Sequence, residues 1–390
     1  MPRFLLAVFL GLALVARAGA QTAPPEVAAK IYLVQDLTSN QTLAQREADT
    51  PTDPASLTKL MTAYIVFAAL KEKKLSLEQP LPVSKRAWAE RKGGGSLMFI
   101  DTTMTPTVDE LLRGLIVQSG NDAAVALAEG TSGTVEEFVA AMNRQAQAWG
   151  LKNTVFKNVT GLTEPGHQST ARDLATIATH IIRDYPEYFP YYSMKEYKYN
   201  NIAQPNRNLL LRRDPTVDGM KTGYTEAAGY CLMATAQRDF PNLGPGGNGN
   251  GKRRLLAVVM NTTSMEARAN EAQKLLNWGY LAFDTMRLFD DGTPIVTPAI
   301  WKGTTNEAKL GAAGGVYVTV PKGEGGKLQT KVERTDPLIA PLAKGQRVGT
   351  IKVATVGGGS IVDVPLVALE AVPQAGFLGR TWDALRLWIK

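Results

Sequence analysis

Three short groups of residues in this 390-residue chain carry side chains suited to nucleophilic chemistry. The first is Ser56 with Lys59, which follow Pro54 at a predicted helix start and share one helix face because they are three residues apart. A serine hydroxyl is a poor nucleophile until a base removes its proton. A lysine can be that base only if burial or positive neighbours lower its pKa. Alone, so short a pattern favours an ordinary helix start with Lys59 in solvent.

The other two groups lie downstream and change this interpretation. Ser119-Gly120-Asn121 falls at a predicted junction of two helices, where a tight turn can direct both side chains outward. Lys221-Thr222-Gly223 precedes a loop that leads into an apolar strand. The patterns S-x-x-K, S-D-N and K-T-G occur together in penicillin-binding proteins and class A β-lactamases. Their co-occurrence in this order makes Ser56 a candidate catalytic nucleophile.

The chain resembles the low-molecular-mass penicillin-binding proteins that are D-alanyl-D-alanine carboxypeptidases. The resemblance covers nearly the whole chain and rests on residues 54–59, 118–123, 161–162, 169–173 and 217–223. S-G-N in place of S-D-N favours this group over class A lactamases. The resemblance implies an α+β fold, with a penicillin-binding-protein/β-lactamase-like transpeptidase domain, a small all-β domain and a C-terminal amphipathic helix. It implies no cofactor and no metal.

Each motif residue then has an expected role. Ser56 attacks the carbonyl of a D-Ala–D-Ala peptide bond and forms an acyl-enzyme, while Lys59 accepts the hydroxyl proton. Lys221, if it points into the same cleft, is the positive neighbour that holds down the pKa of Lys59. Ser119 can relay a proton to the leaving amine, and Asn121 can orient Lys59 and the substrate amide.

The developing oxyanion needs two fixed N–H donors. The family pattern places them at the backbone of Ser56 and of Tyr224, the residue after Gly223. Tyr224 stands where some relatives carry histidine, so the effect of its side chain on deacylation stays open.

The free carboxylate of the substrate calls for cations and hydroxyl groups. Lys221 and Thr222 fit this need, and the resemblance adds Arg207 and Arg268. A surface salt bridge is the alternative interpretation for each arginine.

The composition of the chain limits where the protein can act and which partners it can bind. Residues 1–20 have a positive start, an apolar run and a small-residue cleavage site, which predicts a secretory signal; a retained N-terminal anchor is the alternative. Without the two arginines of this segment, the formal charge falls from +7 to +5. This mild charge suits an anionic polymer or a membrane surface, but not nucleic acid. The single cysteine, Cys231, excludes an internal disulfide and fits a small core residue.

The elements around the motifs predict two domains. An opening hairpin spans residues 31–47, helices with caps at Thr107, Thr134 and Thr170 follow, and residues 80–104 look irregular. Two apolar strands and a helix over 264–280 complete an α+β domain. From residue 288 the short alternating segments predict an all-β stalk. The predicted divisions are 1–20 signal peptide, 21–287 peptidase domain, 288–373 all-β stalk and 374–390 membrane-anchor helix.

The tail, 376–390, is predicted to be an amphipathic helix. Leu378, Trp382, Leu385 and Ile389 form its apolar stripe, with Asp383 among the opposite residues. Two tryptophans and several basic residues suit a helix lying in the headgroup layer. We therefore expect an exported protein at the periplasmic face of the inner membrane; docking of the helix on the stalk is the alternative.

Other residues suggest rival sites or functions. His167 invites a Ser-His-Asp hypothesis, but no G-x-S-x-G elbow is present. Asp173 fits a helix cap or salt-bridge partner better than a catalytic acid. With only two histidines and no C-x-x-C pair, a catalytic zinc site is disfavoured.

The expected substrates are peptidoglycan stem peptides, with β-lactams as acylating inhibitors. One alternative is a β-lactamase of the same fold, since Glu164-Pro165 faintly resembles the loop that carries the class A glutamate. The other is a weakly catalytic cell-wall-binding protein that affects cell shape. The intact set of serines and lysines argues against the second alternative.

Overall fold

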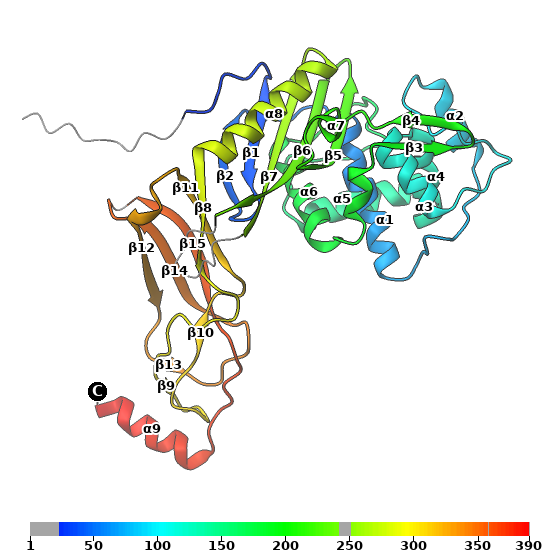
Figure 1. The fold of residues 1–390 in the computed structure, drawn as a ribbon. Helices are drawn as coiled ribbons and strands as arrows, with labels where there is room; N and C mark the ends of the chain where they lie inside the picture. Colours follow the sequence, from blue (N-terminus) through cyan, green and yellow to red (C-terminus); the bar gives the residue numbers. More distant parts are fainter. Residues whose placement is uncertain (1–22, 242–250, 358, 390) are drawn as a thin grey trace, which may run out of the picture.

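The computed structural model describes residues 23–241, 251–357 and 359–389. The predicted signal segment and most of the predicted 241–251 connection lie outside these residues. The described chain forms a large mixed lobe, an elongated β lobe below it, and a C-terminal helix at the far end of the β lobe (Figure 1). The predicted α+β fold class is confirmed.

The large lobe is organised around an antiparallel sheet. In the described residues its strand order is β2-β1-β7-β6-β5. The bounds of these strands are β1 (Ile31–Asp36), β2 (Gln41–Arg46), β5 (Val217–Thr225), β6 (Gly229–Phe240) and β7 (Gly251–Thr262). β1 and β2 are the predicted opening hairpin, and β6 and β7 contain the predicted apolar runs. Helices cover both faces of the sheet, which explains why the middle of β7 is apolar without alternation.

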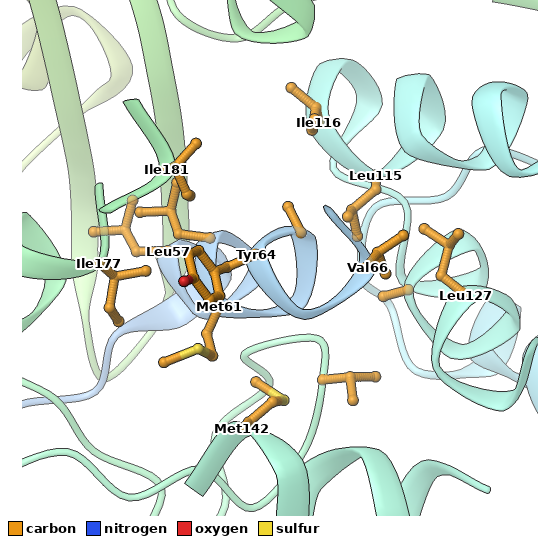
Figure 2. Close-up of a cluster of buried hydrophobic side chains, with 14 of the residues drawn as sticks. Leu57, Met61, Tyr64, Val66, Leu115, Ile116, Leu127, Met142, Ile177 and Ile181 are labelled. Carbon is orange, nitrogen blue, oxygen red and sulfur yellow. The ribbon is translucent and has the colours of Figure 1, made fainter. Parts of the chain in front are cut away.

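Helix α8 (Met265–Ala282) packs on one face through Leu275 and Leu276. The opposite face carries a helical block whose centre is α1 (Lys59–Lys71), a helix buried on nearly all sides. Figure 2 shows α1 among the side chains of Leu115, Leu127, Met142 and Ile177, which come from other parts of this block. A helix that is apolar all round belongs in a core, so the position of α1 is fixed from several directions.

Four further helices of the block are α3 (Val108–Arg113), α4 (Asn121–Ser132), α5 (Val135–Ala148) and α6 (Ala171–Asp184). Three of them, α3, α5 and α6, start at side-chain caps, as predicted, whereas α4 follows Gly120 without one. Thr107, Thr134 and Thr170 each accept a hydrogen bond from the backbone three residues later, and Thr107 forms a full capping box. Cys231 is buried in the core of this lobe.

Some elements differ from the sequence predictions. The stretch 80–104 is not wholly irregular: Ser84 caps the short helix α2 (Lys85–Ala89), and a 3₁₀ turn (Glu90–Lys92) follows. A helix of only five residues is too short to show the apolar periodicity by which a helix is predicted from sequence. Short elements between α6 and β5 were also missed. They are the 3₁₀ turn Phe189–Ser193, the hairpin β3 (Glu196–Tyr199) and β4 (Ile202–Pro205), and α7 (Leu210–Arg213).

The β lobe begins at β8 (Phe283–Phe289), which runs across the predicted division at residues 287 and 288. It pairs with β11 (Val316–Pro321), and a second sheet has the order β10-β15-β14-β12. The remaining bounds are β9 (Ile300–Trp301), β10 (Leu310–Gly311), the 3₁₀ turn Gly325–Lys327, β12 (Leu328–Arg334), β13 (Leu338–Ile339), β14 (Arg347–Thr355) and β15 (Ser360–Ala368).

The two lobes meet at a buried polar joint. The Asp36 carboxylate accepts hydrogen bonds from Arg253 Nε at 2.7 Å, Thr285 Oγ1 at 2.9 Å and Thr319 Oγ1 at 2.7 Å. Gln41 exchanges two further bonds with the Thr319 backbone. Because Asp36 and Arg253 belong to the sheet and both threonines to the β lobe, the network ties the two lobes together.

Candidate active site

The N-terminus of α1 places Ser56 and Lys59. Ser56 lies in a 3₁₀ turn (Ala55–Thr58) that leads directly into α1, rather than in the helix itself. Lys59 Nζ is 3.1 Å from Ser56 Oγ. The side chain of Lys59 is 1% exposed, whereas Ser56 is half-buried and lines a cleft. The spacing predicted this pair, but only the packing around α1 buries the lysine.

Two carbonyl oxygens hold the amine of Lys59 from the other side. Its Nζ is 2.8 Å from Asn121 Oδ1 and 2.6 Å from the backbone oxygen of Thr160. Burial lowers the pKa of Lys59 to about 7; Glu90 and Asp122 oppose this shift, and Arg207 adds to it. The predicted cause, the charge of Lys221, is therefore wrong as the chief one. A lysine with this pKa is substantially neutral near pH 7 and can accept a proton.

Ser119 lies at the predicted helix junction. A π-helical turn (Gly114–Gln118) ends α3, and Ser119 follows it with φ of 61°, in the left-handed region. Lys221 Nζ lies 2.9 Å from Ser119 Oγ. Both side chains are buried, and burial together with the positive charge of Lys59 lowers the pKa of Lys221. The structure thus brings all three motifs together, with Ser119 next to Lys221 and Asn121 next to Lys59.

The K-T-G motif precedes a turn that leads into the apolar strand β6, as predicted, and it also lies within β5, the edge strand of the sheet, which was not predicted. Two glycines inside the strand weaken its sequence signal. A Cβ on Gly223 would lie 3.0 Å from Ala55 Cβ and 3.2 Å from Ser56 N, so the glycine lets β5 run close beside the nucleophile. As an edge strand, β5 has backbone groups that do not pair with β6. Tyr224 follows with its side chain 54% exposed.

Arg207 and Arg268 line the same cleft. Within the described residues neither arginine belongs to an ion pair, so the salt-bridge alternative is not realised there. Arg268 Nη1 donates to the Gly223 carbonyl at 3.0 Å, and Arg207 donates to Ser96 Oγ. Burial lowers the pKa of both, that of Arg268 to about 10, and both stay protonated at neutral pH. Unpaired guanidinium groups in a cleft favour an anionic ligand.

The cleft has a volume of about 390 Å³. It is lined by Ser56, Gly94, Gly95, Ser96, Ser119, Asn121, Gly161, Leu162, Arg207, Thr222, Gly223, Tyr224, Thr225, Tyr230, Met265 and Arg268. Sequence reasoning missed the contributions of Gly95 and Ser96. A Cβ on Gly95 would lie 2.2 Å from Asn121 Nδ2, so the run of three glycines was the available signal for a close approach.

Asp122 is a second residue whose role was missed. Its buried carboxylate accepts hydrogen bonds from the backbone N–H groups of Met98, Phe99 and Ile100 at 2.8–3.2 Å. The Asn121 N–H also donates to the Ser96 carbonyl at 2.7 Å. These bonds fix the loop that carries Gly95 and Ser96 against the start of α4. No pattern in the sequence marks them, because the partners are more than 20 residues apart.

The residues considered for alternative sites, His167, Asp173 and Glu164, do not line the cleft. His167 Nδ1 accepts from the Lys157 N–H at 3.0 Å, which leaves Nε2–H to donate to Thr58 Oγ1 at 2.8 Å. Both nitrogens are thereby occupied, and His167 does not line the cleft. Asp173 accepts a hydrogen bond from the Thr154 hydroxyl near the start of α6. Glu164 is exposed, bonds to Asn158 and does not line the cleft either.

Comparison with known proteins agrees with this geometry. The sequence model of the D-alanyl-D-alanine carboxypeptidase family matches residues 18–264, and that of the penicillin-binding protein 5 C-terminal domain matches 283–374. This chain belongs to the D-alanyl-D-alanine carboxypeptidase family. It is a serine-type carboxypeptidase, and the predicted family and enzyme class are confirmed.

Two similar proteins match about nine-tenths of the chain, and a third matches about two thirds of it. D-alanyl-D-alanine carboxypeptidase DacC of Escherichia coli K12 is 42% identical over 92% of this chain and 88% of its own length. The crystal structure of penicillin binding protein 5 from Haemophilus influenzae is 40% identical, with a TM-score of 0.82 over 90% of this chain and 99% of that one. Penicillin-binding protein D2 from Listeria monocytogenes, in an ampicillin-bound form, is 29% identical, with a TM-score of 0.57 over 66% of this chain and 99% of that one.

Proposed function

We propose that this family member removes the terminal D-alanine from peptidoglycan pentapeptide stems through an acyl-enzyme on Ser56. The observation that carries the proposal is the surroundings of Lys59. Its buried amine lies 3.1 Å from Ser56 Oγ. Its two other hydrogen-bond partners are carbonyl oxygens, those of the Asn121 side chain and the Thr160 backbone. A neutral amine has two N–H groups for these carbonyls and one lone pair left for the serine proton.

Acylation then proceeds in balanced steps. Ser56 Oγ attacks the carbonyl carbon of the D-Ala–D-Ala bond as Lys59 Nζ takes the hydroxyl proton. The tetrahedral intermediate collapses and the C–N bond breaks. The leaving amine receives the proton held by Lys59, relayed through the hydroxyl of Ser119, which contacts Lys221, and Lys59 becomes neutral again. D-Alanine leaves and the remaining peptide stays as an ester on Ser56. A water molecule then hydrolyses this ester, with Lys59 as the base, and frees the serine.

Backbone and cationic groups stabilise the charges. The N–H groups of Ser56 and Tyr224 form the oxyanion hole, and loss of one such donor costs about 10²–10³ in rate. The terminal carboxylate binds to Arg207, Arg268 and Thr222. Support comes from the absence of ion pairs at both arginines within the described residues and from their position in the cleft.

A peptide-cleavage assay tests the proposal. The purified protein should release D-alanine from a D-Ala–D-Ala-terminated pentapeptide, and Ser56→Ala should release none. Benzylpenicillin should form a long-lived adduct that is absent in Ser56→Ala. If the wild-type protein releases no D-alanine, the proposal is wrong.

The same assay separates the alternatives. Rapid turnover of benzylpenicillin without D-alanine release would indicate a β-lactamase. Binding of the peptide with neither reaction would indicate a cell-wall-binding protein. The position of Glu164 outside the cleft argues against a lactamase that deacylates by a class A glutamate.

The C-terminal helix supports a membrane-surface location. α9 (Phe377–Ile389) exposes Phe377, Leu378, Trp382, Leu385 and Trp388. Its polar side faces the β lobe, because the Asp383 carboxylate accepts from Lys302 N–H at 2.7 Å and Arg386 lies over Trp301. Among the described residues, no helix has both the length and the apolar character to cross a bilayer.

We assign α9 as an anchor that lies in the headgroup layer at the periplasmic face of the inner membrane, after export directed by residues 1–20. The proposed division keeps the predicted parts but moves the boundary between peptidase domain and stalk from 287 to the start of β8, which gives a peptidase domain over 21–282, a stalk over 283–373 and the anchor over 374–390. A chain ending at Val372 should remain in the supernatant with anionic vesicles, whereas the full chain should sediment. Sedimentation of both would contradict the anchor.

A further inference from the structure

The Thr160 carbonyl makes a short contact with Lys59. Thr160 lies in a segment between α5 and α6 without regular secondary structure. Its backbone oxygen is 2.6 Å from Lys59 Nζ, the shortest of the three contacts of this amine. The direction of this carbonyl is therefore set by contacts within its own turn.

One side chain, Asn158, organises that turn. Its Oδ1 accepts hydrogen bonds from the N–H of Thr160 at 3.2 Å, the hydroxyl of Thr160 at 3.2 Å and the N–H of Gly161 at 2.8 Å. Its Nδ2 donates to the Leu162 carbonyl at 2.9 Å and to the Glu164 carboxylate at 3.0 Å. The amide thus holds the peptide units on both sides of the Thr160 α-carbon, including the one that carries the Thr160 carbonyl.

The turn also fits tightly against the nucleophile. Gly161 has φ of 82°, and a Cβ there would lie 1.9 Å from the Ala55 carbonyl oxygen. Thr62, one turn after Lys59 on α1, donates to the Val159 carbonyl at 2.8 Å. The segment is consequently held at Val159 by α1 and at Thr160 and Gly161 by Asn158.

This arrangement has a consequence for the base. A neutral amine that donates to Asn121 and to Thr160 has its lone pair directed at Ser56 Oγ, whereas one that loses the Thr160 acceptor can rotate an N–H toward the serine. We propose that Asn158 is a positioning residue: by holding the Thr160 carbonyl against Lys59, it keeps the lone pair of the neutral amine directed at Ser56. This inference rests on the proposed function of Lys59 as the base.

Asn158→Ala tests the inference, with Asn143→Ala as the matched control. Asn143 makes a similar set of bonds to the same segment, at 2.9 Å from the Phe156 N–H and 2.8 Å to its carbonyl, but it does not reach residue 160. We would measure the rate of Ser56 acylation by a fluorescent penicillin between pH 5.5 and 9, together with thermal unfolding. Asn158→Ala should acylate about 10–100 times more slowly, the size expected for a displaced catalytic group. Asn143→Ala should acylate within about threefold of wild type at comparable loss of thermal stability.

The pH profile separates positioning from a merely structural role. The Thr160 carbonyl stabilises the ammonium form of Lys59, so its loss should move the rising limb of the acylation profile to lower pH while the plateau falls. Equal slowing by both alanine variants, or an unmoved limb in Asn158→Ala, would overturn the inference. Wild-type protein that forms no adduct would instead overturn the proposed function.

A second variant covers the case in which Asn158→Ala does not fold. Asn158→Asp combined with Glu164→Gln keeps the acceptor for Thr160 and Gly161 and reverses the direction of the bond to residue 164, and it gives up only the bond to the Leu162 carbonyl. This pair should restore acylation to within about threefold of wild type. A loss of thirtyfold or more in the folded double variant would contradict the inference.

Discussion

The molecule buries cationic side chains in two regions, and only one of these regions supplies a carboxylate to pair with them. At the joint between the lobes, Arg253 is 2% exposed and lies 2.7 Å from the buried carboxylate of Asp36. In the cleft, Lys59, Lys221 and Arg268 are as deeply buried, yet none belongs to an ion pair among the described residues. Desolvation disfavours charge in both places.

The difference lies in how the cost of desolvation is offset. At the joint a carboxylate and two threonine hydroxyls compensate it, so the charge serves to orient one lobe on the other. In the cleft the compensating anion is missing, so the lysines lose basicity and the arginine stays ready for a carboxylate. The comparison therefore predicts that the joint controls stability and the cleft controls reaction rate.

The largest expected effect is at Lys59. Lys59→Met removes the base, and general-base catalysis is worth about 10²–10⁴ in rate, so acylation and D-alanine release should fall by that factor. The free energy of unfolding should change by only about 1 kcal/mol, because relief of desolvation opposes the loss of two hydrogen bonds. Stopped-flow acylation and chemical denaturation measure the two quantities. A rate within tenfold of wild type would break the assignment of Lys59.

The reverse pattern is expected at Asp36. Asp36→Asn leaves the Arg253 cation buried without a carboxylate, which costs about 3–5 kcal/mol. The denaturation midpoint should fall while cleavage of a soluble pentapeptide stays within about twofold of wild type. Asp49→Asn, in a surface pair with Arg172, is the control and should cost less than about 1 kcal/mol. Equal costs for both variants would contradict the comparison.

Arg268 should act on substrate choice. Arg268→Gln removes a buried cation, and a charge-assisted contact of about 1.5–3 kcal/mol corresponds to about a 10–100-fold lower kcat/KM for a peptide with a free carboxylate. A C-terminally amidated peptide should be affected less. Arg213→Gln, whose guanidinium pairs with Glu266 outside the cleft, serves as the control. An equal loss of kcat/KM for both peptides would show that Arg268 only holds the backbone of β5 at Gly223 in place.

The smallest expected effect is the pH dependence of the wild type. Because the folded pKa of Lys59 is about 7, acylation should rise with pH through about 7, and at pH 6 it should be about tenfold below its plateau. For stability, the unfolded chain binds more protons at Lys59 between about pH 7 and 10.5, so this residue makes the protein more stable as pH rises through that window. If the acylation rate instead rises with pH only near pH 10, the proposed mechanism would be contradicted.

Local sequence patterns predicted much of this protein. Serine and lysine three residues apart predict a shared helix face, and threonine followed three residues later by glutamate or aspartate predicts the caps observed on α3, α5 and α6. The joint co-occurrence of the three motifs predicted the family and the enzyme class. These features depend only on neighbours along the chain or on a set of motifs, so no spatial information was required.

The tertiary structure decided the chemistry of the same residues. The pKa of Lys59 depends on burial by helices distant in sequence, which is why Lys221 was wrongly predicted as the chief cause. β5 was missed as a strand because Gly219 and Gly223 weaken the strand signal; Gly223 allows the close approach to Ala55 and Ser56. Asp122 lies in the 118–123 motif, but its bonds to residues 98–100 have no signature in the sequence, because they join segments distant in the chain. The contact of the Thr160 carbonyl with Lys59 has none either, because a backbone carbonyl is present at every residue. Sequence alone predicted which side chains take part in the reaction, and the tertiary structure sets the burial and the contacts on which their reactivity depends.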